Sequence, residues 1–123
     1  MLKRTTIAVF ALLAASLLAP SADAHPTLKS ANPPAEGVAV REPTEIKLNF
    51  SEGVISKFSS VELKDQGGNK IAIGKVATNP KDQKELVVPL QAPLKPGTYI
   101  VTWNIVSVDT HRVHGTYSFK VGG

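Results

Sequence analysis

The sequence predicts an all-β domain, an antiparallel sandwich of about seven short strands. Apolar and polar residues alternate in four segments, the period-two pattern of half-buried strands. The apolar positions are Ile46, Leu48 and Phe50; Val61 and Leu63; Tyr99, Val101, Trp103 and Ile105; and Tyr117, Phe119 and Val121. Turn-forming segments separate them at residues 32–37, 64–70, 78–84 and 93–97. Because no segment beyond the leader sustains a helical period, we expect a two-layer sandwich of immunoglobulin-like shape.

The first 24 residues have the organisation of a secretory signal peptide. Lys3 and Arg4 precede an uncharged run of 12 residues, 7–18, and the small-residue segment 22–24 (Ala-Asp-Ala) follows. A membrane-spanning helix needs about 20 apolar residues, so an uncleaved anchor is the weaker interpretation. Cleavage after Ala24 leaves an exported chain that begins at His25 and does not span the membrane.

The remaining 99 residues suffice for one small domain, 25–123. The chain has no cysteine, so no disulfide stabilises the fold in an oxidising compartment. Twelve Lys and Arg remain against nine Asp and Glu after cleavage, a net charge of +3. These charges are scattered singly and form no basic patch, which argues against nucleic-acid binding.

The segment 98–107 is predicted to be a central strand. Its alternation places Trp103 on the inward face, in a core with Phe50 and Phe119. Tyr99 follows the turn sequence Leu-Lys-Pro-Gly, which is typical of a tyrosine corner, where the hydroxyl bonds to the backbone.

Three histidines are the candidate metal ligands. His25 becomes the first residue on cleavage, so that it offers an amine and an imidazole, and Pro26 has no backbone N–H to compete for a metal. Asp109 and His111 are two residues apart and share a face if the preceding strand persists. His114 would face away unless the chain turns, and we assign it no role.

Nitrogen ligands with one carboxylate oxygen suit Cu(II), although zinc and nickel bind such ligands more weakly. The only methionine is Met1, which leaves with the leader, so the mature chain lacks the soft sulfur ligands of Cu(I) and of blue-copper sites.

Three segments carry a resemblance: residues 25–37 (HPTLKSANPPAEG), 46–54 (IKLNFSEGV) and 96–115 (PGTYIVTWNIVSVDTHRVHG). The chain resembles the CopC family of exported copper-binding proteins, in the subgroup with a Cu(II) site and no Cu(I) site. The resemblance implies a Greek-key, cupredoxin-like sandwich or barrel. It also implies a copper-homeostasis or copper-resistance role in the periplasm, with one Cu(II) per chain and a CopD-like inner-membrane copper transporter as partner.

The resemblance further implies the metal ligands. They are the amine and ring of His25, with Asp109 and His111. Glu52 matches a carboxylate that lies near the copper in some members, and a surface acid is an equally good interpretation of it. Met-rich members carry Cu(I) ligands in mid-chain, where this sequence has residues 64–75 (KDQGGNKIAIGK) with neither Met nor His.

Three other functions are less consistent with the sequence. A copper-dependent oxidative enzyme of the lytic polysaccharide monooxygenase type also uses an N-terminal histidine, but Asp109 would fill the plane that oxygen needs. An exported sandwich without metal remains if cleavage misses His25. Ser51 and Ser107 lie near the histidines, but no nucleophile-elbow motif frames them, so a hydrolase is disfavoured. We expect a protein that is not an enzyme.

Overall fold

The computed structural model describes residues 25–39 and 42–122. The predicted signal peptide, residues 1–24, lies outside the described residues. Those described form one short 3-10 helix, η1 (Ser56–Phe58), and nine strands. The strands are β1 (Leu28–Asn32), β2 (Val38–Ala39), β3 (Glu45–Phe50), β4 (Ser60–Asp65), β5 (Lys70–Ile71), β6 (Ala77–Asn79), β7 (Asp82–Pro89), β8 (Gly97–Val106) and β9 (Arg112–Val121).

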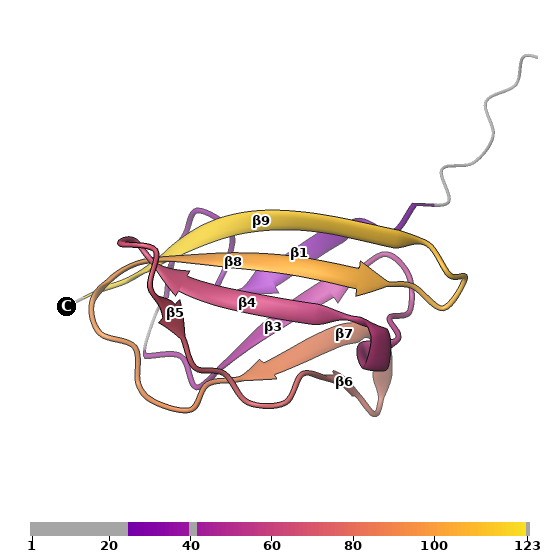
Figure 1. Ribbon diagram of the computed structural model, residues 1–123, viewed down its shortest axis with the longest axis horizontal. Coiled ribbons are helices and arrows are strands. Elements are labelled where there is room, and N and C mark those ends of the chain that lie inside the picture. The colour runs from indigo at the N-terminus through magenta and orange to yellow at the C-terminus, as the bar shows by residue number, and fades with distance from the viewer. Residues whose placement is uncertain (1–24, 40–41, 123) are drawn as a thin grey trace, which may run out of the picture.

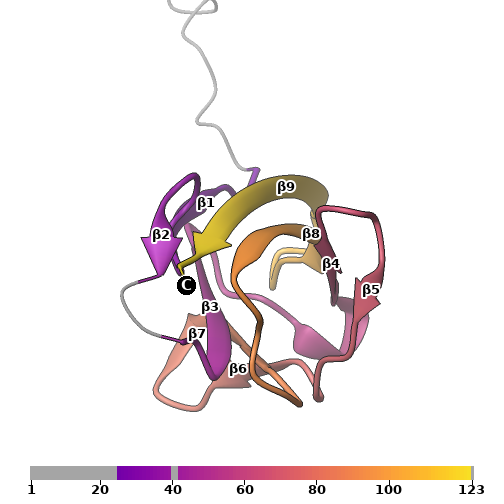
Figure 2. The same ribbon diagram turned by 90° about the vertical axis from the view of Figure 1, so that its left-hand side faces the viewer.

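The strands form two sheets that pack face to face, with orders β1-β3-β7-β6 and β2-β9-β8-β4-β5. Figure 2 looks along the sandwich and shows the two layers. The longest strands, β8 and β9, pair antiparallel over their whole length, and Figure 1 shows them running along the molecule. The predicted all-β sandwich is confirmed.

The core follows the predicted alternation of inward and outward residues along β3, β8 and β9. Trp103 is only 9% exposed and packs edge-on against Phe50, with ring centroids 6.0 Å apart. Gly115 lies opposite Trp103, and a Cβ there would come within 2.3 Å of the indole. Tyr99 stacks on Phe119 at 5.7 Å. Each large apolar side chain buried in this way contributes about 1.5–3 kcal/mol, so the core can hold the fold without a disulfide.

The predicted tyrosine corner is present. The Tyr99 hydroxyl donates a hydrogen bond of 2.7 Å to the carbonyl oxygen of Lys95. This bond fixes the turn that leads into β8, and β8 in turn carries the chain toward Asp109.

Three details differ from the expectation. Strands β1, β2, β5, β6 and β7 lie outside the four alternating segments, and two of them, β2 and β5, have only two residues each. Residues 82–84, expected in a turn, belong to β7, which is exposed at its start and buries Leu86 and Val88 only further along. The pairing of β2 with β9 is parallel rather than antiparallel. Strands β1, β2, β5 and β6 are short strands at sheet edges, and the interior strand β7 is exposed over its first three residues. These strands bury too few residues to show a clear period in the sequence.

The N-terminal segment and the β8–β9 connection lie at the same end of the sandwich, on the right in Figure 1. The segment between β3 and η1 joins them, because the Ser51 N–H donates to the Thr27 carbonyl oxygen at 2.9 Å and the Ile55 N–H donates to the Val106 carbonyl oxygen at 2.8 Å. Three parts of the chain that are distant in sequence therefore meet at one end of the fold. None of the described residues forms a helix long and apolar enough to cross a membrane.

Candidate metal centre

The connection between β8 and β9 is a tight turn built on Ser107. The Thr110 N–H donates to the Ser107 carbonyl oxygen at 2.8 Å, and the Ser107 N–H donates to the His111 carbonyl oxygen at 2.9 Å. Thr110 has a φ of 69°, in the left-handed region that non-glycine residues rarely occupy. Strand β8 ends at Val106, so the condition that the strand persists to His111 is not met, and the turn brings the two side chains together instead.

Asp109 and His111 contact one another across this turn. Asp109 Oδ1 lies 3.3 Å from His111 Nδ1, and the two side chains are 42% and 40% exposed. A hydrogen bond from Ser107 and, second, the nearby His111 hold the pKa of Asp109 below its ordinary value. The carboxylate is therefore ionised at neutral pH while solvent, and a metal ion, can still reach it.

The His111 ring is close to the carboxylate without being well bonded to it. Nδ1 is buried and has no aligned hydrogen-bond partner among the described residues, despite its distance of 3.3 Å from Oδ1. Buried polar atoms are normally paired, so such an atom is typical of a site that binds something. A metal ion with nitrogen and oxygen ligands fits this donor set.

His25 is held beside this turn by its own segment. Two bonds of 2.9 Å join Thr27 to Ser51, one from the Thr27 N–H to Ser51 Oγ and one from the Ser51 N–H to the Thr27 carbonyl oxygen. Pro26 is buried, whereas His25 is exposed. The His25 ring contacts the His111 ring edge-on, with centroids 5.3 Å apart and an interplanar angle of 73°.

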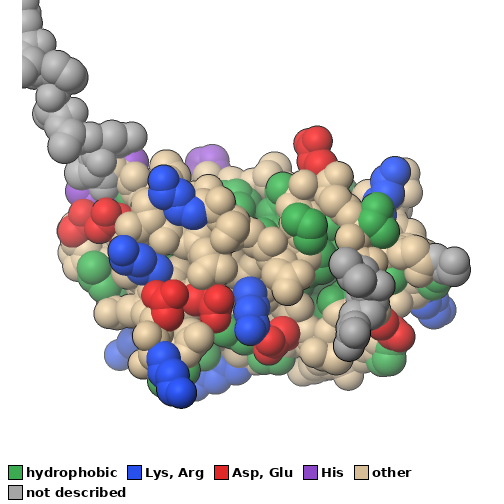
Figure 3. Space-filling model, turned by 180° about the vertical axis from the view of Figure 1, so that it is seen from behind, with side chains coloured by type: hydrophobic (Ala, Val, Ile, Leu, Met, Phe, Trp, Pro, Cys, Tyr) green, Lys and Arg blue, Asp and Glu red, His purple; other side chains and the backbone are tan. Residues whose placement is uncertain are grey.

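Figure 3 shows the histidine side chains visible from behind toward one end of the molecule, with acidic side chains beside them. The structure thus brings His25, Asp109 and His111 to one place, as two neighbouring pairs. Within residues 25–39 and 42–122 no three His, Asp or Glu side chains are grouped closely enough to hold a metal ion by themselves. In the unprocessed chain the nitrogen of His25 belongs to a peptide bond, so the fourth predicted donor, its amine, exists only after cleavage.

Glu52 and His114 are placed differently. Glu52 sits in the bend between Ser51, which binds the N-terminal segment, and Gly53, whose carbonyl oxygen accepts the Val108 N–H at 2.9 Å. It is therefore next to the site in the chain. His114 lies within β9, opposite Asn104, and is exposed.

Ser107 and Ser51 are the site residues whose role the sequence did not reveal. The sequence suggests both only as nucleophiles, whereas in the structure each bonds to a segment that carries a candidate ligand. The pattern Ser-x-Asp-x-His at residues 107–111 was a usable signal, because a serine two residues before an aspartate is placed to bond within a turn.

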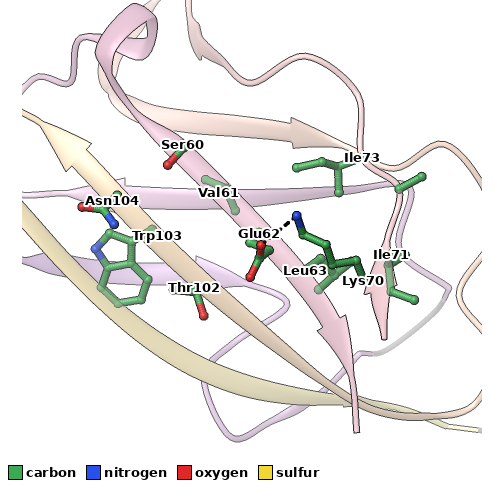
Figure 4. Close-up of a pocket in the computed structure, with 11 residues that line it drawn as sticks. Ser60, Val61, Glu62, Leu63, Lys70, Ile71, Ile73, Thr102, Trp103 and Asn104 are labelled. Carbon is green, nitrogen blue, oxygen red and sulfur yellow. Dashed lines mark ion pairs between the residues drawn. The ribbon is translucent and has the colours of Figure 1, made fainter. Parts of the chain in front are cut away.

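A hollow with a volume of about 660 Å³ lies away from this centre, beside β4 and β5. Figure 4 shows Glu62 and Lys70 facing each other across it. Lys70 Nζ is 3.1 Å from one Glu62 oxygen, and Lys64 Nζ is 3.4 Å from the other. The lysines neutralise Glu62, the one acidic residue that lines this hollow, and lower its pKa. The charge of Glu62 is therefore paired within the protein.

Comparison with known proteins shows the family of the chain. The CopC domain model matches residues 28–122. "Protein YobA" of Escherichia coli strain K12 is 43% identical over 111 residues, 90% of each chain, and "Copper resistance protein C" of Escherichia coli is 43% identical over 108 residues, 82% of this chain and 84% of the relative. The crystal structure of PcoC, a methionine-rich copper resistance protein from Escherichia coli, superposes with a TM-score of 0.72 at 41% identity, covering 80% of this chain and 99% of PcoC.

The fold and the described side chains define a two-layer β-sandwich with histidine and carboxylate side chains at one end. The chain belongs to the CopC domain family.

Proposed function

We propose that this protein binds one Cu(II) ion in the periplasm and serves copper homeostasis or resistance without catalysing a reaction. The copper-resistance names of its relatives support the metal and the role. The observation that carries the proposal is the contact of the His25 ring with the His111 ring at 5.3 Å, beside the ionised Asp109. Two imidazoles and a carboxylate that meet at an exposed end form a set of donors suited to Cu(II).

The proposed ligands are the amine and ring of His25, together with Asp109 and His111. Removal of residues 1–24 supplies the amine, and Pro26 prevents the metal from recruiting the next backbone nitrogen. Glu52 is a secondary candidate, because the bend that carries it is bonded to both ligand-bearing segments.

Copper bound at this exposed end is accessible to a second protein. We propose a CopD-like inner-membrane copper transporter as the recipient, because a site without a buried cavity can exchange its ion on contact.

The experiment that tests the function is a competitive Cu(II) titration of the chain beginning at His25. His111→Ala should raise the dissociation constant by about tenfold or more, since loss of a single supporting residue already costs about 10–100-fold in metal sites. His114→Ala is the matched control, because this histidine is exposed on β9, and it should change the constant much less. Equal losses in the two variants would show that the second imidazole has been misassigned.

A further inference from the structure

Ser107 occupies an unusual position for a polar residue. It is fully buried, and it is the one polar side chain in the core of the part of the chain that the structure describes. A buried hydroxyl without partners would cost free energy, so its hydrogen bonds must account for its place.

Those hydrogen bonds join Ser107 to both candidate metal ligands of the turn, Asp109 and His111. Ser107 Oγ donates to Asp109 Oδ1 and accepts the His111 N–H at 3.2 Å. The His111 carbonyl oxygen lies 3.4 Å from Oγ, but it already accepts the Ser107 N–H. Because a hydroxyl has a single proton to donate, that proton goes to the carboxylate.

We propose that Ser107 is a positioning residue, which orients Asp109 and His111 for the metal and leaves Asp109 Oδ2 as the ligating oxygen. The proposal rests on the Cu(II) function above. Oδ1 is engaged by Ser107 and lies 3.3 Å from His111 Nδ1. No other described residue donates a hydrogen bond to Oδ2, so that oxygen is available and the carboxylate binds through one atom.

The same hydroxyl fixes the backbone on both sides of Asp109. Its bond to the His111 N–H, with the two backbone bonds of the turn, sets the distance between the carboxylate and the imidazole. Without it the carboxylate would rotate, and the metal would have to order it on binding. Supporting hydrogen bonds of this kind are typically worth about 10–100-fold in metal affinity.

Ser107→Ala in the chain beginning at His25 tests the proposal by competitive Cu(II) titration. We expect a dissociation constant about 10–100-fold higher, together with a changed Cu(II) EPR spectrum. Ser107→Thr retains the hydroxyl and should restore most of the affinity and the spectrum. Thermal melts of the metal-free variants set a temperature at which all of them are folded.

Ser59→Ala is the matched control. Ser59 Oγ donates to the Ile55 carbonyl oxygen at 2.8 Å and accepts the Val106 N–H at 3.0 Å, so it supports the same end of β8 without touching a ligand. This variant should leave Cu(II) affinity unchanged. Equal losses in Ser59→Ala and Ser107→Ala would reduce Ser107 to a structural role and overturn the proposal.

Two further outcomes separate this inference from the function on which it rests. If the unmodified chain binds no Cu(II) tightly, the function fails; if it binds tightly and Ser107→Ala binds equally well, only the positioning role fails. A crystal structure of the Cu(II)-loaded protein should show Oδ2 alone on the metal and Oδ1 still bonded to Ser107. A carboxylate bound through both oxygens would contradict the inference.

Discussion

The β4–β5 turn and the β8–β9 turn each carry an aspartate with a lowered pKa, and they use it differently. Both oxygens of Asp65 are taken up by Asn69, at 2.9 and 3.2 Å to Oδ1 and at 3.1 Å to Oδ2. Asp109 is held through Oδ1 by Ser107, beside His111. The hydrogen bond of the Asn69 backbone is the main cause of the lowered pKa of Asp65, and that of Ser107 is the main cause for Asp109.

The difference separates a carboxylate with a structural role from the one that we propose to bind metal. A lowered pKa alone does not distinguish them, because hydrogen bonds to the charged form lower it in both turns. Asp109 differs from Asp65 in two ways. One of its oxygens accepts no hydrogen bond from the described residues, and the imidazole of His111 lies beside it. The resemblance places the Cu(I) ligands of Met-rich members in the segment 64–75, which includes the β4–β5 turn, and here that segment has neither Met nor His.

Reduction of the bound copper should have the largest effect on metal binding. Ascorbate with a Cu(I) chelator should remove all the copper from the loaded protein, because neither turn contains the sulfur ligands that Cu(I) prefers. Absorbance of the chelator complex measures the release. Tightly retained Cu(I) would contradict the comparison, since it would require a second site outside the β8–β9 turn.

Replacing each aspartate by alanine should separate the two roles. Asp109→Ala should weaken Cu(II) binding by about tenfold or more, whereas Asp65→Ala should leave it unchanged. Competitive titration of both variants beside the unmodified chain measures this. A comparable loss in Asp65→Ala would mean that the turns do not differ as the hydrogen bonds indicate.

The smallest effect is expected on the stability of Asp65→Ala. This substitution should lower the free energy of unfolding by an amount that depends on pH. The pKa of Asp65 is lowered in the folded protein, so its contribution is present above the unfolded value, about 3.9, and is lost as pH falls through the folded pKa. Denaturant unfolding should therefore show the unmodified chain more stable than the variant at pH 7, with a difference that shrinks below about pH 4. A stability difference that grew as the pH fell would contradict this prediction.

The regular part of the fold was predictable because its signal is repetitive. Alternation around Ile46, Trp103 and Phe119 places them in the core. The Leu-Lys-Pro-Gly turn before Tyr99 predicts a bond from its hydroxyl to the backbone, and the structure shows Lys95 as the acceptor. The two-residue strands β2 and β5 bury too little to leave a pattern in the sequence.

For the candidate site, the sequence indicates residue types and not their geometry. Asp109 and His111 do meet, but through a turn with Thr110 at positive φ rather than through a continued strand. The role of Ser107 depends on its burial and on the hydrogen bonds of its hydroxyl to Asp109 and His111. The spacing of these residues in the sequence does not determine either feature. The link between Thr27 and Ser51 depends on the register of β1 against β3, in which Leu28 lies opposite Phe50.

The central claim is that processing creates the metal site by freeing the amine of His25. Competitive Cu(II) titration at one pH should compare the chain beginning at His25 with the same chain carrying one additional glycine before it. The account predicts one tightly bound Cu(II) for the first protein and affinity lower by about tenfold or more for the second, although Asp109 and all three imidazoles remain. Affinity of the first should also fall in acid, because a free α-amine, with a reference pKa of about 7.7–8.0, must lose its proton to bind. Indistinguishable affinities for the two proteins would remove the amine from the site and contradict the claim.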